Sequence, residues 1–265
     1  MIFDNVNRLK LKLKCKEFNG FCFSMDVDWA SDFVIEFAIK YFDEKNIPVM
    51  FFLTHKNKYI GNLIKNGTIQ YGIHPNFIQP SSQGETREDI IKYCLDAFPK
   101  TRAFRSHRWY ADNDIYTQLY DSGIKYESNL CTMLNVMMPY IHRSGMVSFP
   151  VFLEDGAYLY HNLDLRFNNV KNIFAEDGLK VINIHPMHLI LNTPYFKYMR
   201  DIKDSVSREK WNNMSSEDVD IYRNNSSVGI ADFIGEIINY IEKNQIETYS
   251  MEDMYDYIAK GAVEG

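Results

Sequence analysis

The chain has 265 residues, of which 46% are apolar and 15% aromatic, so it can bury a large core in one β/α barrel or in two small domains. Its formal net charge of −6 argues against a general nucleic-acid binder, because phosphate contacts need a basic surface. No apolar run reaches about 18 residues and the N-terminus shows no signal-peptide pattern, so we expect a soluble, cytoplasmic protein without a membrane span. The composition does not indicate an oligomeric state.

The cysteines give no sign of a disulfide framework or a zinc knuckle. No two of them form a Cys-x-x-Cys pair; they are Cys15, Cys22, Cys94 and Cys131. We therefore expect reduced, partly buried thiols.

The first half of the chain alternates predicted strands with predicted helices. Residues 8–16 alternate leucine with lysine, which favours an edge strand over a basic surface strip, because lysines keep an exposed edge from pairing with other chains. Residues 21–30 then begin with a β-prone apolar run. Further strands are predicted at 47–53, 69–73 and 102–106, and helices at 32–46, 59–66, 86–97 and 113–122. This alternation is typical of parallel β/α units.

The second half continues the pattern with one long interruption. Strands are predicted at 124–128, 146–152, 179–184 and 246–250, and a helix at 229–243. Residues 192–225 are polar and aromatic without a clear period, which predicts an irregular insertion. Because no internal repeat is visible, we expect a single domain over residues 1–265, with a strand count close to that of a barrel.

Two carboxylates, Asp26 and Asp28, follow the first apolar run. Residues two apart on an extended chain point to the same side, so both could reach one pocket. Ligands of β/α proteins bind where parallel strands end, because loops and helix N-termini converge there. The alternative is that both residues only form a turn or cap the next helix.

Three later segments also end predicted strands in polar residues. His74 follows the strand at 69–73, Arg105 and His107 lie at the end of 102–106, and His185 follows 179–184. Four strand ends of this kind favour a functional site over isolated turns.

In this order the segments resemble the polysaccharide deacetylases of NodB homology, also called carbohydrate esterase family four. Ser-Met-Asp-Val-Asp-Trp at 24–29 is similar to the motif that supplies a base and a metal-binding aspartate, which implies that Asp26 is the base and Asp28 a ligand. Tyr-Gly-Ile-His implies that His74 binds the metal. Phe-Arg at 104–105 implies that Arg105 orients the base, and Ile-His at 184–185 implies that His185 is the acid.

The sequence also departs from that pattern. The second histidine of the family would fall at Ile78, the aspartate pair is interrupted by Val27, and Ser106-His107 stands where a proline pair is usual. The His-Pro-Asn-Phe and Ser-His-Arg segments are similar to a divergent subgroup associated with bacterial surface-polysaccharide gene clusters.

The missing histidine leaves the metal short of a third ligand. We predict that His107 replaces it, because on an extended strand it projects to the same side as Arg105. His185, Asn76 and Asp155 are the other candidates.

Further residues have weaker support for a role in the site. Asp155 and Asp164 are candidate orienters of His185, although an ordinary loop acid is favoured for each. His188 is discounted as a ligand because Pro186 argues against a helical His-x-x-His pair. His55 is favoured as a core or surface residue. Four aromatic residues beyond site strands are candidates to stack on sugar rings or to pack the core: Trp29, Phe77, Trp109 and Tyr110.

We therefore predict an α/β fold of NodB-homology type, a distorted (β/α) barrel of about seven strands. The resemblance implies a hydrolase that uses a divalent metal, expected to be zinc, to remove an N-acyl or O-acyl group from a small or oligomeric sugar in surface-polysaccharide synthesis. One alternative is a hydrolase of a non-sugar amide or imide. The other is a carbohydrate-binding protein with a decayed metal site, which the incomplete ligand set favours.

Overall fold

The structure is a computed structural model that describes residues 14–263. The edge strand expected at 8–16 lies mostly outside the described residues, and residues 14–16, which are described, form a helical end and a turn. Within residues 14–263, no helix has the length and apolar character needed to cross a membrane.

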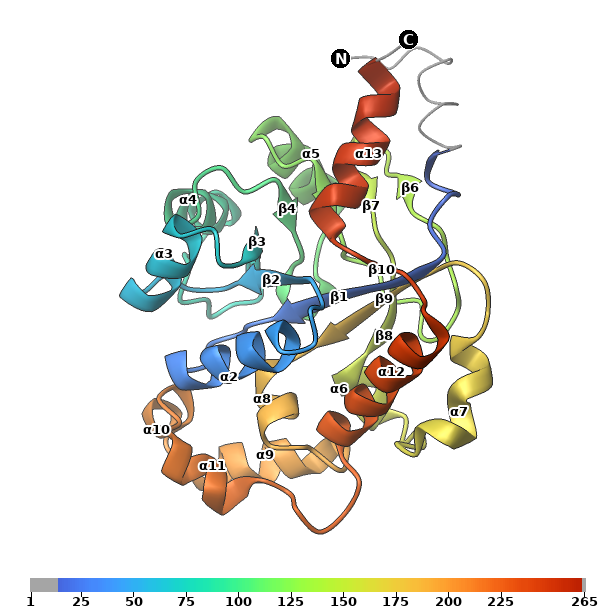
Figure 1. Cartoon of the computed structure of the whole chain (residues 1–265). Helices are drawn as coiled ribbons and strands as arrows, with labels where there is room; N and C mark the ends of the chain where they lie inside the picture. The colour runs from blue at the N-terminus through green and yellow to red at the C-terminus, as the bar shows by residue number, and fades with distance from the viewer. Residues whose placement is uncertain (1–13, 264–265) are drawn as a thin grey trace.

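One strongly curled sheet organises the chain (Figure 1). Its strands follow one another in the order β6 (Tyr140–Ile141), β7 (Val147–Ser148), β5 (Tyr126–Glu127), β4 (Ala103–Phe104), β3 (Gln70–Ile73), β2 (Val49–Leu53), β1 (Gly20–Asp26), β9 (Leu179–Ile184) and β8 (Val151–Glu154). Strand β10 (Thr248–Tyr249) pairs with β1. All neighbours are parallel except β6 and β7. A bridge between Cys131 and Val151 brings the chain beyond β5 to β8, so the sheet curls towards closure.

Helices surround this sheet. They are α2 (Asp32–Asp43), α3 (Lys58–Lys65), α4 (Arg87–Ala97), α5 (Asn113–Asp121), α6 (Asp155–Tyr160), α7 (Phe167–Phe174), α8 (Pro186–Ile190), α9 (Phe196–Ser205), α10 (Arg208–Asn212), α11 (Ser216–Tyr222), α12 (Ile230–Asn244) and α13 (Met251–Val263), with a 3-10 turn η1 (His107–Trp109). Several begin at a side chain that accepts a free backbone N–H group, which fixes where each helix starts. These caps are Ser31, Asn57, Thr86 and Asp112.

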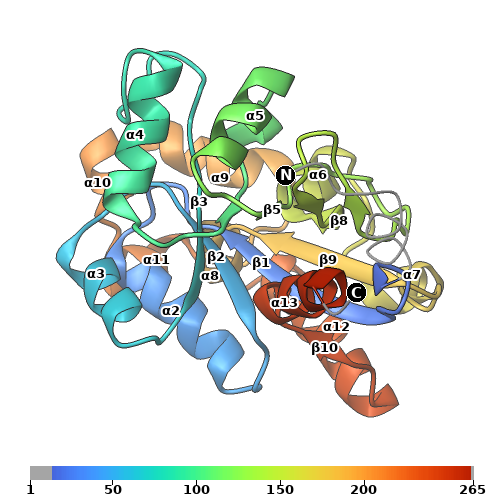
Figure 2. The same cartoon turned by 90° about the horizontal axis from the view of Figure 1, so that it is seen from above.

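Strand alternation divides the core into two parts. Outward-facing residues such as Phe23, Phe51 and Ile182 pack under the surrounding helices. Inward-facing residues such as Cys22 and Val181 instead pack against α13, which is seen nearly end-on in front of β1 and β9 in Figure 2. On β1 the inward positions continue from Cys22 to Ser24 and Asp26, so polar groups lie above an apolar layer at the carboxyl ends of the strands.

The expected fold class is confirmed, and the details differ where elements are short. Over residues 14–263 the sheet has ten strands, and five of these contain only two residues, which carry little sequence signal. The single strand predicted at 146–152 is two strands, β7 and β8. Residues 192–225, predicted to be irregular, contain the helices α9, α10 and α11, and α13 was missed altogether.

Candidate active site

Asp26, the last residue of β1, is held by two partners, one in β9 and one directly after β4. Nη1 of Arg105 donates to its Oδ1 at 2.9 Å, and Nδ2 of Asn183 donates to its Oδ2 at 2.9 Å. Burial alone would raise the pKa of Asp26, but the charge of Arg105, with smaller effects of His74 and His185, lowers it below the usual value. The carboxyl group is therefore held ionised.

Arg105 is completely buried and each side of its guanidinium has a partner. Nε donates to the carbonyl of Ser128 at 2.5 Å and Nη2 to the Ser128 hydroxyl at 2.6 Å, while Nη1 also contacts Oδ1 of Asn183 at 2.5 Å. A guanidinium fixed in this way can only present its Nη1 edge to Asp26. Asn183 and Ser128 were not identified from the sequence, since a single Asn or Ser on a buried strand carries no motif.

Asp28 reaches the site from a turn, not from the strand. Strand β1 ends at Asp26, and Asp28 has φ of 48°, a left-handed conformation that Asp tolerates better than most residues. The expectation that Asp26 and Asp28 project together from an extended chain is therefore wrong in its geometry. The turn directs the Asp28 carboxylate towards His74 and His107 instead.

His107 also reaches Asp28 by a route that the sequence did not suggest. Strand β4 ends at Phe104, and His107 lies in the turn η1, so the extended strand assumed for it is absent. Nevertheless, Nδ1 of His107 lies 3.0 Å from Oδ1 of Asp28. The backbone N–H of His107 donates to the carbonyl of Pro75 at 2.9 Å, and that of Ser106 donates to Oδ1 of Asn129 at 2.9 Å.

Asp28, His74 and His107 together fit a divalent ion. One ligand atom from each lies within 4.8 Å of the others, and Nε2 of His74 is 3.4 Å from Oδ1 of Asp28. Nδ1 of His74 is buried and has no hydrogen-bond partner among residues 14–263. Burial would raise the pKa of Asp28, but hydrogen bonds from His107 and His74 lower it well below the usual value. A carboxylate and two imidazoles are a ligand set that zinc accepts.

Ile78, where the family's second histidine would fall, has a side chain that cannot bind metal. Ile78 is half-buried, and its backbone N–H donates to Oδ1 of Asn76 at 3.1 Å. This bond commits Asn76 to shaping the loop after β3.

A second group of polar residues centres on His185, directly beyond β9. Its Nδ1 lies 2.6 Å from Oδ1 of the fully buried Asp155, and its backbone N–H donates to Oδ2 at 2.7 Å. Burial would lower the pKa of His185, but the charge and hydrogen bond of Asp155 raise it well above the usual value. Asp155 is therefore the carboxylate hydrogen-bonded to His185, with Oε1 of Glu154 farther away at 3.5 Å, whereas Asp164 forms an ion pair with Arg166.

His188 lies in the same group, so the reason for discounting it was wrong. Pro186 is the first residue of α8, a position where proline is compatible with a helix, and the ring centroids of His185 and His188 are 5.7 Å apart. Asp155, His185 and His188 form a second set whose possible ligand atoms lie within 4.8 Å of one another. Burial lowers the pKa of His188 to about 4.

The aromatic residues named from the sequence divide between the site and its surroundings. The indole of Trp29 packs edge-on against the ring of His107, with centroids 5.4 Å apart. Trp109 lies against the Arg105 guanidinium at 5.4 Å, Tyr110 is half exposed, and Phe77 packs partly on the core. The ring of His55 is 3.0 Å from the hydroxyl of Thr54.

Comparison with known families decides the relationship. Residues 23–203, about two thirds of the chain, match the model described as WbmS-like polysaccharide deacetylase. The chain belongs to the WbmS-like polysaccharide deacetylases. The resemblance seen in the sequence is confirmed, and the chain is a deacetylase-type hydrolase of amide or ester bonds.

Several solved structures are similar to this WbmS-like deacetylase. A Bordetella bronchiseptica protein assigned as a polysaccharide deacetylase involved in O-antigen biosynthesis is 25% identical, with a TM-score of 0.72 over 83% of this chain and 90% of that one. A Mycobacterium smegmatis protein assigned as a polysaccharide deacetylase is 14% identical, with a TM-score of 0.46 over 88% and 94% of the two chains. The peptidoglycan N-acetylglucosamine deacetylase Bc1960 is 10% identical, with a TM-score of 0.49 over 90% and 92%. No curated protein matched the sequence.

Proposed function

We propose that this WbmS-like deacetylase removes an acyl group from an N-acylated or O-acylated sugar, with a divalent ion, zinc, held by Asp28, His74 and His107. The observation that carries the proposal is the convergence of these three side chains beside the buried Asp26. Three protein ligands and an open position are the arrangement of catalytic zinc sites. The same convergence supports catalysis over a decayed metal site, since His107 supplies what Ile78 lacks.

Asp26 is the general base in this proposal. Nδ1 of His74 lies 3.9 Å from Oδ1 of Asp26, so the base is next to the ligand cluster without being hydrogen-bonded to it. When bound, the ion would acidify a water molecule and polarise the substrate carbonyl. Asp26 would accept the proton of that water, and Arg105 and Asn183 would keep its carboxylate oriented.

His185 is the general acid. Because Asp155 raises its pKa, the imidazolium form persists at neutral pH and can donate a proton to the departing amine or alcohol. The hydrogen bond from Nδ1 to Asp155 also leaves Nε2 as the nitrogen available to the leaving group.

The substrate class rests on the relative and on the family. The description of the Bordetella protein supports a role for this chain in surface-polysaccharide synthesis. A cytoplasmic location remains part of the proposal, and the four free cysteines agree with a reducing compartment.

Zinc calorimetry paired with an acetate-release screen tests the proposal. Wild type should bind one zinc ion, Asp28→Ala and His74→Ala should bind it far more weakly, and zinc-loaded wild type should release acetate from at least one N- or O-acetyl sugar. Equal zinc binding by all three proteins would remove the site assignment. Release from non-sugar amides or imides alone would replace the sugar by that substrate class.

A further inference from the structure

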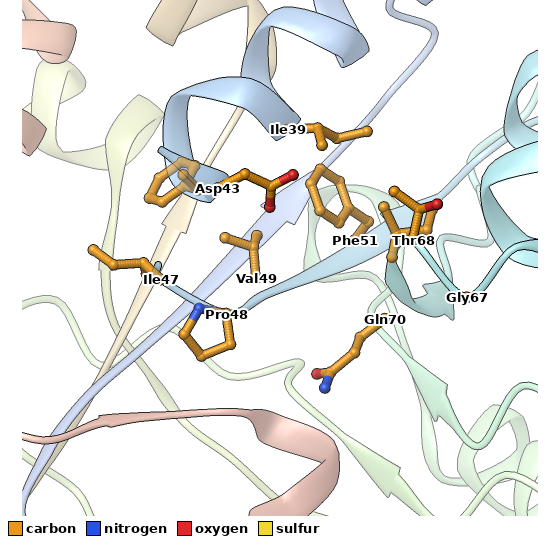
Figure 3. Close-up of a pocket in the computed structure, with 11 residues that line it drawn as sticks. Ile39, Asp43, Ile47, Pro48, Val49, Phe51, Gly67, Thr68 and Gln70 are labelled. Carbon is orange, nitrogen blue, oxygen red and sulfur yellow. The ribbon is translucent and has the colours of Figure 1, made fainter. Parts of the chain in front are cut away.

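Two pockets lie at opposite ends of the sheet. The one in Figure 3 has a volume of about 240 Å³ and lies where β2 and β3 begin, lined by residues that include Val49, Gln70 and Asp43. It is at the amino ends of the strands, away from Asp26 and the histidines. The other, of about 490 Å³, lies between the turn after β1 and the connection from α10 to α11.

We propose that this second pocket binds one sugar ring of the substrate beside the metal ligands. The inference rests on the proposed function and specifies where its substrate is recognised. The pocket is lined by Trp29, Ala30, Ser31, Asp32, Phe33, His55, Asn57, Asn212, Asn213, Met214 and Ser215. Its volume falls within the range of about 300–1,000 Å³ that is common for small-ligand sites.

Trp29 connects the pocket to the reacting groups. It directly follows Asp28 in the chain, and its indole packs against His107 with ring centroids 5.4 Å apart. Trp29 therefore contacts a predicted metal ligand and also lines the pocket. An acyl group on a sugar bound in the pocket would extend towards Asp28 and His107.

The lining combines two aromatic side chains with polar groups that have unused hydrogen-bonding capacity. Trp29 is half-buried and Phe33 is 37% exposed, so both can present ring surface to the C–H face of a sugar. The side chain of Asn212 makes no hydrogen bond with any described residue. Asn213 donates through Nδ2 to the carbonyl of Glu209 at 2.9 Å, which leaves its Oδ1 to accept from a hydroxyl.

The far wall of the pocket is fixed, and it lies outside the segment that matches the family model. The hydroxyl of Ser31 donates to the carbonyl of Met214 at 2.7 Å, and Met214 is 1% exposed, so residues 212–215 are fastened to the turn that carries Asp28. This wall lies beyond residue 203, where the family match ends. The pocket can therefore select a sugar that the shared catalytic groups do not specify.

Direct binding of simple sugars tests this pocket. N-acetylglucosamine, N-acetylgalactosamine and N-acetylmannosamine would be titrated into zinc-loaded protein, with binding followed by protein NMR. Phe33→Ala and Asn212→Ala remove one ring and one amide without touching Asp28, His74 or His107. Each should weaken the best sugar by about tenfold, the usual effect of losing one such contact. Tyr160→Ala, which removes an aromatic residue 62% exposed outside the pocket, should not weaken it.

Zinc affinity of the same variants separates this inference from the proposed function. Weaker sugar binding with wild-type zinc affinity in Phe33→Ala and Asn212→Ala supports the pocket. Saturable sugar binding that neither variant weakens, or no binding of any of the three sugars by wild type, overturns it. If Phe33→Ala and Asn212→Ala weaken sugar binding but wild type shows no affinity for zinc, the pocket is supported and the proposed metal-dependent function is wrong.

Discussion

Nη1 of Arg105 lies 2.9 Å from Oδ1 of Asp26, and the two side chains are 0% and 6% exposed. The pair joins the ends of β4 and β1, which are 79 residues apart in the chain. Because both groups are buried, each depends on the other for compensation of its charge, unlike an ion pair on the surface. The stability of the fold and the ionisation of the base are therefore coupled at this contact.

Arg105→Met should show this coupling in urea unfolding. The variant keeps an apolar stem but leaves Asp26 buried without its cation, so the free energy of unfolding should fall by about 3–5 kcal/mol at pH 7. In wild type the pKa of Asp26 is lower in the folded than in the unfolded state, so its ionised form stabilises the fold at pH values above the unfolded-state pKa. This stabilisation is lost as the pH falls through the folded-state pKa. In Arg105→Met, burial without the cation raises the folded-state pKa of Asp26. Protonation of Asp26 as the pH falls then removes the unpaired buried charge and stabilises the variant.

The stability difference between wild type and Arg105→Met should consequently shrink between pH 7 and pH 4. Arg166→Met, which removes an arginine 71% exposed and paired with Asp164 at the surface, provides the control and should cost little. A loss in Arg105→Met that is the same at both pH values would show that packing, not charge, accounts for it.

The sequence predicted the strand ends better than it predicted how the chain leaves them. Strand β9 was placed at its observed bounds because four of its six residues are apolar and His185-Pro186 follows it directly. The positions of Asp28 and His107 depend on left-handed residues in the turns, at Asp28 and Arg108, which apolar periodicity does not encode. The sequence therefore predicted that Asp28 and His107 lie together, but it did so from an extended strand at His107 that the structure does not contain.

Residues that act through tertiary contacts were the hardest to find. Asn183 pairs with Ser24 in the register of β1 and β9, so both side chains face inward and lie in the polar layer. Asn129 fixes the turn of His107 through the backbone N–H of Ser106, a contact between two loops. Neither residue type forms a motif by itself, so their roles emerge only when the strands are brought together.

Asp26→Asn should separate the base from the metal ligands. The variant keeps the size of the side chain but loses most of its basicity, so turnover should fall by about two to four orders of magnitude while zinc affinity is retained. The measurements are acetate release on the best sugar of the screen and zinc calorimetry on the same preparation. Full turnover would exclude Asp26 as the base, and loss of zinc would make it a ligand.

Asp155→Asn should shift the pH dependence of the reaction. His185 must be protonated to act as an acid, and this form is lost as the pH rises through its raised pKa. Removing the Asp155 charge lowers that pKa, so the alkaline limb of kcat/KM should move to lower pH. Asp164→Asn is the matched control, because Asp164 pairs with Arg166 away from His185. An unchanged alkaline limb in Asp155→Asn would remove His185 as the acid.

The two histidine groups allow a direct test of which imidazole completes the metal site. His107 shares a cluster with Asp28 and His74, whereas His188 shares one with Asp155 and His185. Loss of a residue that only supports a metal ligand lowers metal affinity by about 10–100-fold. His107→Ala should lower the zinc affinity by more than this, because it removes a ligand itself. His188→Ala removes the same ring from the neighbouring group and should leave zinc affinity close to wild type.

Calorimetry on wild type and both variants, at a pH where the ligand imidazoles are neutral, distinguishes the outcomes. If His188→Ala loses zinc and His107→Ala does not, the ion binds at Asp155, His185 and His188, and His185 is then a ligand and not the acid. If both lose it, the two groups share one ion or bind two ions cooperatively, and the stoichiometry of the titration separates these cases. Only selective loss in His107→Ala supports His107 as the ligand that stands in for the residue missing at Ile78.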